Sequence, residues 1–135
     1  MRFFCVITVA VFLFSITGCG SNVSVSGKVT FDDGSPLTTG EVRFETTNFV
    51  SSGKIQSDGT YRLGTTSEKD GIPKGSYGVT VHAMGQPELT PGMRTEHVPP
   101  PKSLIDTKFG STSTSGLTCE VKGSTTFNIT VRKPE

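Results

Sequence analysis

The sequence lacks most residues that would mark a helical, disulfide-bonded or strongly charged protein. It has no tryptophan, two tyrosines and three cysteines in 135 residues. Its 13 lysines and arginines nearly balance its 12 aspartates and glutamates, so net charge gives no argument for binding nucleic acid. After residue 20 no segment shows the apolar i, i+3, i+4, i+7 spacing of an amphipathic helix. These absences favour one small domain of short strands and turns.

Cysteine usage excludes an internal disulfide. Cys5 and Cys19 fall within the first 20 residues, which leaves Cys119 alone in the rest of the chain. Because a disulfide needs two cysteines, the domain cannot form one internally. Cys119 shares the face of an alternating run with Leu117 and Val121, and we expect a buried thiol instead of a reactive one.

The motifs of common catalytic and metal sites are also missing. The chain has no Gly-x-Ser-x-Gly elbow, no His-Glu-x-x-His pair and no phosphate-binding loop. The two histidines, His82 and His97, occur in different contexts, which is untypical of a zinc site. Asp32, Asp33 and Asp58 lie beside glycines with the spacing of turns, not of a calcium loop. We therefore predict no metal, no cofactor and no enzyme activity.

The N-terminal residues have the pattern of an export signal. Arg2 precedes an apolar run over residues 3–16, which is shorter than the roughly 20 residues of an ordinary spanning helix. The run ends in Ile16-Thr17-Gly18-Cys19, which resembles the lipobox of bacterial lipoproteins. The resemblance implies a signal peptide over residues 1–18 and lipidation of Cys19. The alternative is an ordinary signal peptide that is cut nearby.

The residues after the lipobox bear on location. Gly20 follows the cysteine, and by resemblance to Gram-negative sorting rules this favours the outer membrane. Residues 19–22 would then be the lipidated cysteine and a tether of only about 10 Å. We expect a lipid-anchored monomer of the bacterial cell envelope that lies close to the membrane, on its periplasmic or external face.

The remaining chain alternates apolar and polar residues in about seven short runs. These runs are residues 23–31, 41–46, 54–56, 60–64, 76–83, 117–121 and 125–131. Residues 51–53 read as a turn, and the last two runs read as a hairpin across residues 122–124. The pattern predicts an all-β fold, a single β-sandwich over residues 23–133.

One segment, residues 84–103, does not fit a strand because it contains five prolines. We call this segment the proline-rich loop. Long loops on rigid scaffolds are common recognition sites, and we name Gln86, Met93, Arg94 and His97 as candidate partner-binding residues. The alternative is a surface excursion without a binding role. We expect the residues just after the loop, 104–109, to fix its far end, and residues 111–116 to be flexible.

Several of these pieces occur in the order of a known family. Gly27-Lys28-Val29-Thr30-Phe31, Asp58-Gly59-Thr60-Tyr61-Arg62-Leu63 and Pro73-Lys74-Gly75-Ser76-Tyr77 together resemble the carboxypeptidase regulatory-like domain, a prealbumin-like (transthyretin-like) sandwich. The similarity covers roughly residues 23–84, and the tail resembles small planctomycete-type lipoproteins. The resemblance implies a non-catalytic module with a structural or protein-interaction role. We expect Tyr61 and Tyr77 to lie at the core edge with their hydroxyls bonded to the backbone.

Two other functions and one modification remain as alternatives. A transthyretin-like protein could carry a small ligand, which predicts an oligomer with an apolar channel. A transthyretin-like hydrolase would need an early histidine and a Tyr-Arg-Gly-Ser motif, which this chain lacks. Lys28 and Asn128 lie in the first and last runs, as an isopeptide bond would require, but both alternate with the inward residues. We therefore expect no isopeptide bond.

Overall fold

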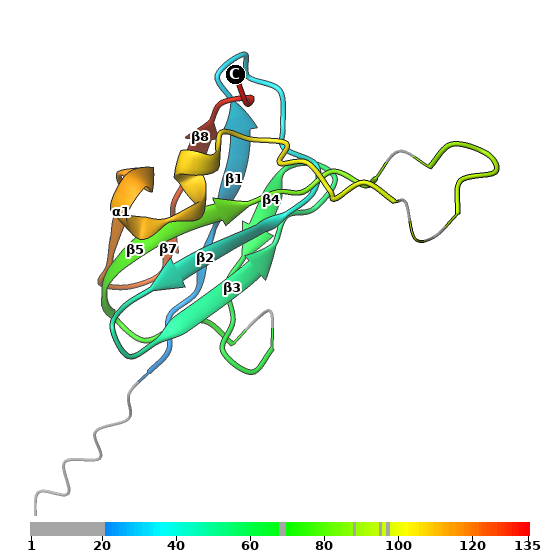
Figure 1. The fold of residues 1–135 in the computed structure, drawn as a ribbon. Coiled ribbons are helices and arrows are strands. Elements are labelled where there is room, and N and C mark those ends of the chain that lie inside the picture. The colour runs from blue at the N-terminus through cyan, green and yellow to red at the C-terminus, as the bar shows by residue number, and fades with distance from the viewer. Residues whose placement is uncertain (1–20, 68–69, 88, 95, 97) are drawn as a thin grey trace, which may run out of the picture.

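The computed structural model describes residues 21–67, 70–87, 89–94, 96 and 98–135, which form a two-layered β-sandwich (Figure 1). One sheet contains β1 (Val25–Phe31), β4 (Thr60–Arg62), β7 (Thr125–Thr126) and β8 (Ile129–Val131). The other has the order β3 (Val50–Lys54), β2 (Glu41–Glu45), β5 (Gly75–His82) and β6 (Leu117–Val121). The predicted all-β sandwich is confirmed.

β1 lies in the middle of the first sheet, and its residues alternate as predicted. Val25 and Val29 are fully buried, whereas Lys28 is exposed. The strand pairs with β4 in antiparallel fashion and with β7 and β8 in parallel. Outside the strand, Val23 exchanges backbone hydrogen bonds with Ile72 over 2.8 and 3.0 Å. The N-terminal end of the described chain is thereby attached to the start of the β5 segment.

Two tight turns are stabilised by aspartates that the sequence analysis assigned to turns. The carboxylate of Asp33 accepts hydrogen bonds from the Ser35 hydroxyl and backbone N–H over 2.5 and 2.9 Å. Asp58 accepts the same two bonds from Thr60 over 2.6 and 3.0 Å. These bonds lower the pKa of both carboxyls. The prediction that these aspartates form turns is confirmed.

The predicted turn at residues 51–53 is wrong, because these residues belong to β3. Ser51 and Gly53 point inward and are buried, and the strand pairs with β2 along its whole length. The buried Ser51 hydroxyl donates to the Gly64 carbonyl over 2.6 Å. Small polar residues fit here because the segment after β4 passes close by, with Ser52 bridging to Gly64.

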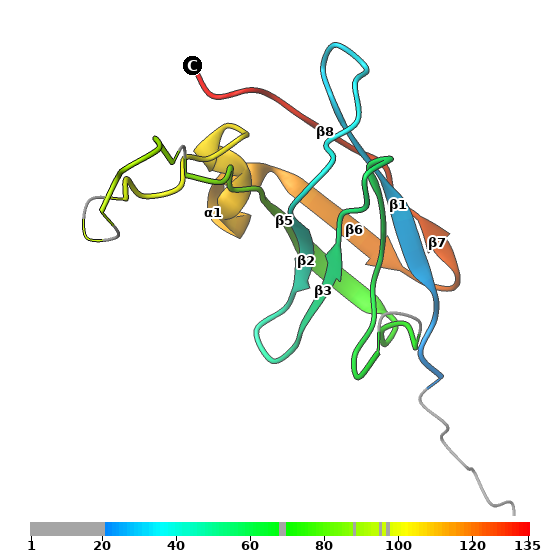
Figure 2. The ribbon, with the colours of Figure 1, turned by 90° about the vertical axis from the view of Figure 1, so that its right-hand side faces the viewer.

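The predicted hairpin of the last two runs is also wrong. β6 pairs with β5 in one sheet, while β7 and β8 pair with β1 in the other. Residues 122–124 therefore cross between the layers (Figure 2). The crossing buries Val121 in one layer and Ile129 in the opposite one. A hairpin would have placed both in the same sheet.

β7 and β8 are two halves of one interrupted strand. The interruption falls at Phe127, whose carbonyl accepts a hydrogen bond of 2.5 Å from the Tyr61 hydroxyl. A Cβ atom on Gly27 would lie 1.9 Å from this carbonyl oxygen and 2.9 Å from the Tyr61 ring. The Tyr61 ring therefore reaches Phe127 past β1 only because position 27 has no side chain. The Tyr77 hydroxyl donates to the Pro73 carbonyl over 2.8 Å, so both tyrosine predictions are confirmed.

Residues 107–115 contain two short helical turns, η2 (Thr107–Gly110) and α1 (Thr112–Ser115), which pack against β5. Phe109 is buried, and the buried Ser115 hydroxyl donates to the Val79 carbonyl over 2.7 Å. The expectation of a flexible segment at residues 111–116 did not foresee this helical turn. Its polar side chains are bonded to the sandwich and to one another, which orders the segment.

Candidate functional site

The proline-rich loop leaves the sandwich after β5 and returns to the same place (Figure 1). Met84 and Ser103 form an antiparallel bridge at its base. One step further out, the Gly85 N–H donates to the Lys102 carbonyl over 2.8 Å. These contacts extend β5 as a short two-stranded stem. The loop is therefore fixed at its base.

The foot of the stem is anchored in the core. The Leu104 N–H donates to the Ala83 carbonyl over 2.9 Å, and the Ser103 hydroxyl donates to the Ile105 carbonyl over 2.6 Å. Ala83, Ile105 and Phe109 are buried. The prediction that residues 104–109 fix the far end of the loop is confirmed.

The outer part of the loop contains a tight turn. The Met93 N–H donates to the Thr90 carbonyl over 2.9 Å, and Pro91 and Gly92 are the two central residues. Gly92 has φ of +90°, so the turn has the Pro–Gly chemistry of type II, which requires a positive φ at its third residue. The prolines therefore build a defined turn in this loop.

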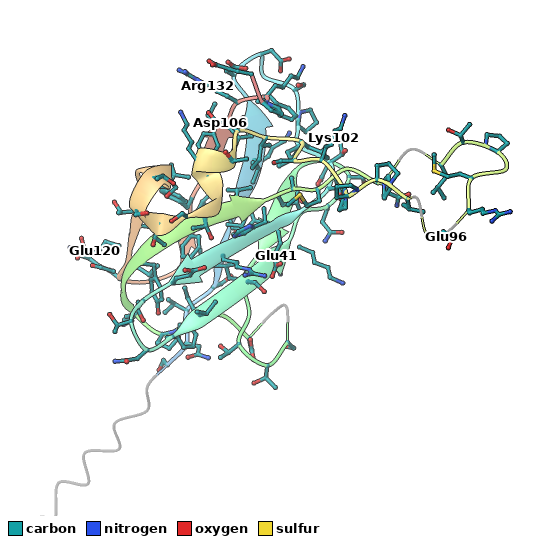
Figure 3. The ribbon with its side chains drawn as sticks, viewed as in Figure 1. Glu41, Glu96, Lys102, Asp106, Glu120 and Arg132 are labelled. Carbon is teal, nitrogen blue, oxygen red and sulfur yellow. The ribbon has the colours of Figure 1, made fainter. Side chains whose placement is uncertain are left out.

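The candidate residues of the loop do not come together in one pocket. Met93 adjoins the outer turn and is 38% exposed. The Arg94 Nη1 atom lies 3.8 Å from the Glu96 Oε1 atom, and both side chains are largely exposed. Figure 3 shows Glu96 far from the sandwich, on the projecting part of the loop. His97 lies outside the described residues.

Gln86 lies nearer the base, beside a depression between the two arms of the loop. The depression has a volume of about 320 Å³ and is lined by Gln86 and Pro87 from one arm and Pro99, Pro100 and Leu104 from the other. Lys102 lies where the loop returns to the sandwich (Figure 3). Rigid proline rings line this depression, and none of its described lining residues carries a carboxylate, thiol or imidazole. Such a surface can bind an apolar or extended segment, and Lys102 is the one ionisable side chain among its described lining residues.

Apolar side chains are concentrated on this loop. Leu89 is 70% exposed and Met84 is 59% exposed, and Met93 and Val98 are also exposed. Only Val50 and Leu104 join them among the exposed large apolar residues of the described chain. Exposed apolar groups that gather on one projecting element commonly mark an interaction surface.

The predicted lipidation site, Cys19, and the signal peptide lie outside the described residues. The first described residues are already bonded to the body of the sandwich. The Asn22 amide donates to the Thr65 hydroxyl over 3.3 Å, and Val23 is bonded to Ile72. Little free chain is therefore left between residue 19 and the folded body.

Asp70 was not a candidate for chemistry, and its carboxylate has a structural role. Backbone N–H groups of Thr65, Thr66 and Ser67 donate to the Asp70 carboxylate over 2.5 to 3.1 Å, and these bonds lower the pKa of Asp70. His82 is half-buried at the end of β5. Within the described ranges, no three His, Cys, Asp or Glu side chains form a group that could hold a metal ion.

Cys119 and the Lys28–Asn128 pair are placed as the alternation predicted. Cys119 is 7% exposed on β6, and burial raises the pKa of its thiol. The Lys28 and Asn128 side chains are both exposed. The Asn128 Oδ1 atom accepts a hydrogen bond of 3.0 Å from the Lys28 backbone N–H. Asn128 therefore bonds to the main chain of β1, and the Lys28 amino group is not its partner.

One surface feature was missed by the sequence analysis. Lys28, Lys54 and Arg62 line the same depression, on the outer face of the β1 sheet. The alternation placed Lys28 and Arg62 outward on their strands, but it gave no sign that these strands are neighbours. Lys54 was predicted to begin a short run over residues 54–56, because residues 51–53 were predicted to form a turn, and nothing in that run indicated its neighbours.

Within the part of the chain that the structure describes, no helix is both long enough and apolar enough to cross a membrane. The similarity to the carboxypeptidase regulatory-like domain rests on the order of short motifs around strands and turns. No protein-family model matches the chain, and no curated protein or solved structure matches it either.

Proposed function

We propose that this protein is a non-catalytic, lipid-anchored β-sandwich of a bacterial cell envelope. In this proposal the sandwich is a carboxypeptidase regulatory-like module, held at the outer membrane through acylated Cys19. Its function is to present the proline-rich loop to another envelope protein. The loop recognises that protein through its exposed apolar side chains.

The observation that carries the proposal is the position of the loop relative to the N-terminal end of the described chain. The chain enters β1 at Val25, and β1 ends six residues later at Phe31. Phe31 lines a depression together with Ser103 and Leu104 at the foot of the loop. At about 3.3 Å per residue, β1 spans roughly 20 Å. The loop thus projects from the end of the sandwich away from residue 21 (Figures 1 and 2).

This arrangement suits a membrane-anchored recognition element. An anchor at residue 19 would hold the N-terminal end of β1 near the bilayer and direct the loop away from it. The loop is braced by its stem and by the Pro91–Gly92 turn. A pre-ordered loop loses less conformational entropy on binding than a free segment does, which favours affinity.

The bonding and burial of several potentially reactive groups support a non-catalytic role. The carboxylates of Asp33, Asp58 and Asp70 bond to their own turns. The Cys119 thiol is buried, and the Tyr61 hydroxyl is bonded to a backbone carbonyl. These five groups, which could have served as a base or nucleophile, are thus bonded or buried in the described structure.

The lipid anchor is tested by metabolic labelling of the full chain in a Gram-negative host. Labelled palmitate is expected to enter the wild type and to be absent from Cys19→Ala, because acylation requires that thiol. Cys5→Ala is the matched control, since it removes a second leader cysteine and should keep full labelling. Equal labelling of the wild type and Cys19→Ala would rule out the anchor.

Partner recognition is tested with a photo-crosslinking amino acid at position 86 of the anchored protein. The wild-type loop is expected to give a defined adduct with one envelope protein. Combined Leu89→Ser, Met93→Ser and Val98→Ser should reduce the adduct about tenfold, because the apolar contact surface is lost. Val50→Ser removes an equally exposed apolar side chain outside the loop and should leave the adduct intact. An adduct that survives the triple change would contradict the assignment of recognition to the loop.

A further inference from the structure

A second binding surface lies on the outer face of the β1 sheet, and it does not depend on the anchor or the loop. Alternation along β1 turns Ser26 and Lys28 outward. The register pairs Ser26 with Arg62 on β4 and with Thr126 on β7. Three neighbouring strands therefore contribute polar side chains to one face.

This face is hollowed into an open depression of about 560 Å³. Its floor is formed by the β1 and β4 backbones at Gly27 and Tyr61, because the Tyr61 side chain turns inward to reach Phe127. Lys54, at the end of β3, and Gln56 close one side. The inward position of the Tyr61 side chain, which stabilises the core, thus leaves the outer face of the β1 sheet open at this point.

The depression is positively charged. Lys28, Lys54 and Arg62 line it, and none of its described lining residues is acidic. Among the described residues, no carboxylate lies at ion-pair distance from any of the three. Asp58 is close enough to Lys28 for its pKa to be lowered slightly by that charge, but its carboxylate is bonded to Thr60. Although the whole chain has a formal charge of only +1, three cations gather here without paired anions.

Asn128 adds a fixed hydrogen-bond donor. Its Oδ1 atom accepts the Lys28 backbone N–H at the point where the β7–β8 strand is interrupted. This bond orients the amide and leaves its Nδ2 group available at the lining of the depression. The Ser26 and Thr126 hydroxyls lie in the same lining. A ligand here meets three charges and a set of neutral polar groups.

The lining also indicates which anion fits. The Tyr61 ring is only 2% exposed, so no aromatic face is available for stacking a nucleic-acid base. None of the described lining residues is aliphatic, which disfavours an acyl chain. Separate cations interspersed with hydroxyl and amide groups match a hydroxyl-rich ligand that carries several negative groups. We propose that this depression binds an anionic oligosaccharide bearing sulfate or carboxylate groups.

The proposal is tested with the full chain in an uncharged detergent, by titration with short dextran sulfate, polygalacturonate and neutral dextran. Saturable binding is expected for at least one of the two charged saccharides, which identifies the preferred anionic group, and none for neutral dextran. The affinity should fall as salt rises, because the contacts are charged and exposed. Equal binding of neutral dextran, or of a single-stranded oligonucleotide, would overturn the proposal.

Matched variants locate the binding. Combined Lys28→Gln, Lys54→Gln and Arg62→Gln should weaken binding about tenfold or more at low salt, because three charge-assisted contacts are lost. The control combines Lys74→Gln, Lys122→Gln and Arg132→Gln. It changes the net charge by the same amount as the first triplet, but outside the depression, and should weaken binding less than about twofold. Lys28→Arg with Lys54→Arg should keep binding. Thermal unfolding checks that each variant is folded. Equal losses in the two Gln triplets would refute the site.

Discussion

Replacing Gly27 by alanine is expected to lower the free energy of unfolding by about 3 kcal/mol or more. The new Cβ atom would lie 1.9 Å from the Phe127 carbonyl oxygen and 2.9 Å from the Tyr61 ring. Neither neighbour can move freely, because they are bonded to each other over 2.5 Å and Tyr61 is buried. The methyl group must therefore either displace β7–β8 from β1 or break the buried hydrogen bond. Chemical denaturation of the two proteins measures the loss.

Gly123→Ala is the matched control for this change. A Cβ atom at position 123 meets no atom within 4 Å, so its effect should stay within about 1 kcal/mol of zero. Tyr61→Phe alone should cost about 1 to 3 kcal/mol because it leaves the Phe127 carbonyl without its partner. A protein with both Gly27→Ala and Tyr61→Phe should lose less free energy of unfolding than the sum of the losses in the two single variants. A Gly27→Ala protein as stable as the wild type would contradict the close approach.

The parts of the fold that depend on local rules could be predicted from the sequence. The alternation of Val25 and Val29 with polar residues identified β1, and the Asp-Gly pairs located the turns at residues 33 and 58. Both signals act within a few residues, since side chains alternate along a strand and an aspartate can bond to its own turn. The tyrosine hydroxyls also found backbone partners as expected.

The parts that depend on contacts between distant segments could not be predicted. Ser51 and Gly53 have the composition of a turn, and only the neighbouring segment at Gly64 makes them a buried strand. β6 and β7 have the spacing of a hairpin, yet each pairs with a different sheet. Turn composition and spacing describe a short stretch of chain, whereas strand pairing is decided by the whole core.

The same division applies to the candidate sites. Five prolines identified residues 84–103 as a long loop, but its stem and its type II turn follow from backbone pairing that the composition does not specify. The basic depression depends on the register that sets Ser26 opposite Arg62 and on the position of β3. The sequence alone does not show which distant strands are neighbours, so it does not show that their charged side chains lie close together. A balanced net charge also concealed their local clustering.

Truncation of Phe44 to alanine is expected to lower the free energy of unfolding by about 3 to 5 kcal/mol. Phe44 is fully buried in β2, and its ring centroid lies 5.9 Å from those of Tyr77 and Phe127. Tyr77 belongs to the same sheet, whereas Phe127 comes from the opposite one. The ring thus contacts both layers, and its loss leaves a cavity between them. Thermal and denaturant unfolding should show this loss without a change in strand content at low temperature.

Two further variants separate cavity formation from the loss of aromatic contacts. Phe44→Leu keeps most of the volume and should cost about 1 to 2 kcal/mol, of which part is the edge-to-face contact with Phe127. Phe49→Ala removes a ring that also contacts Tyr77 but is only partly buried, so it should cost less than Phe44→Ala. If Phe49→Ala were the more damaging of the two, the core would not be centred on Phe44. The expected order follows from burial, because a cavity between two sheets cannot be filled by water without exposing apolar side chains on both.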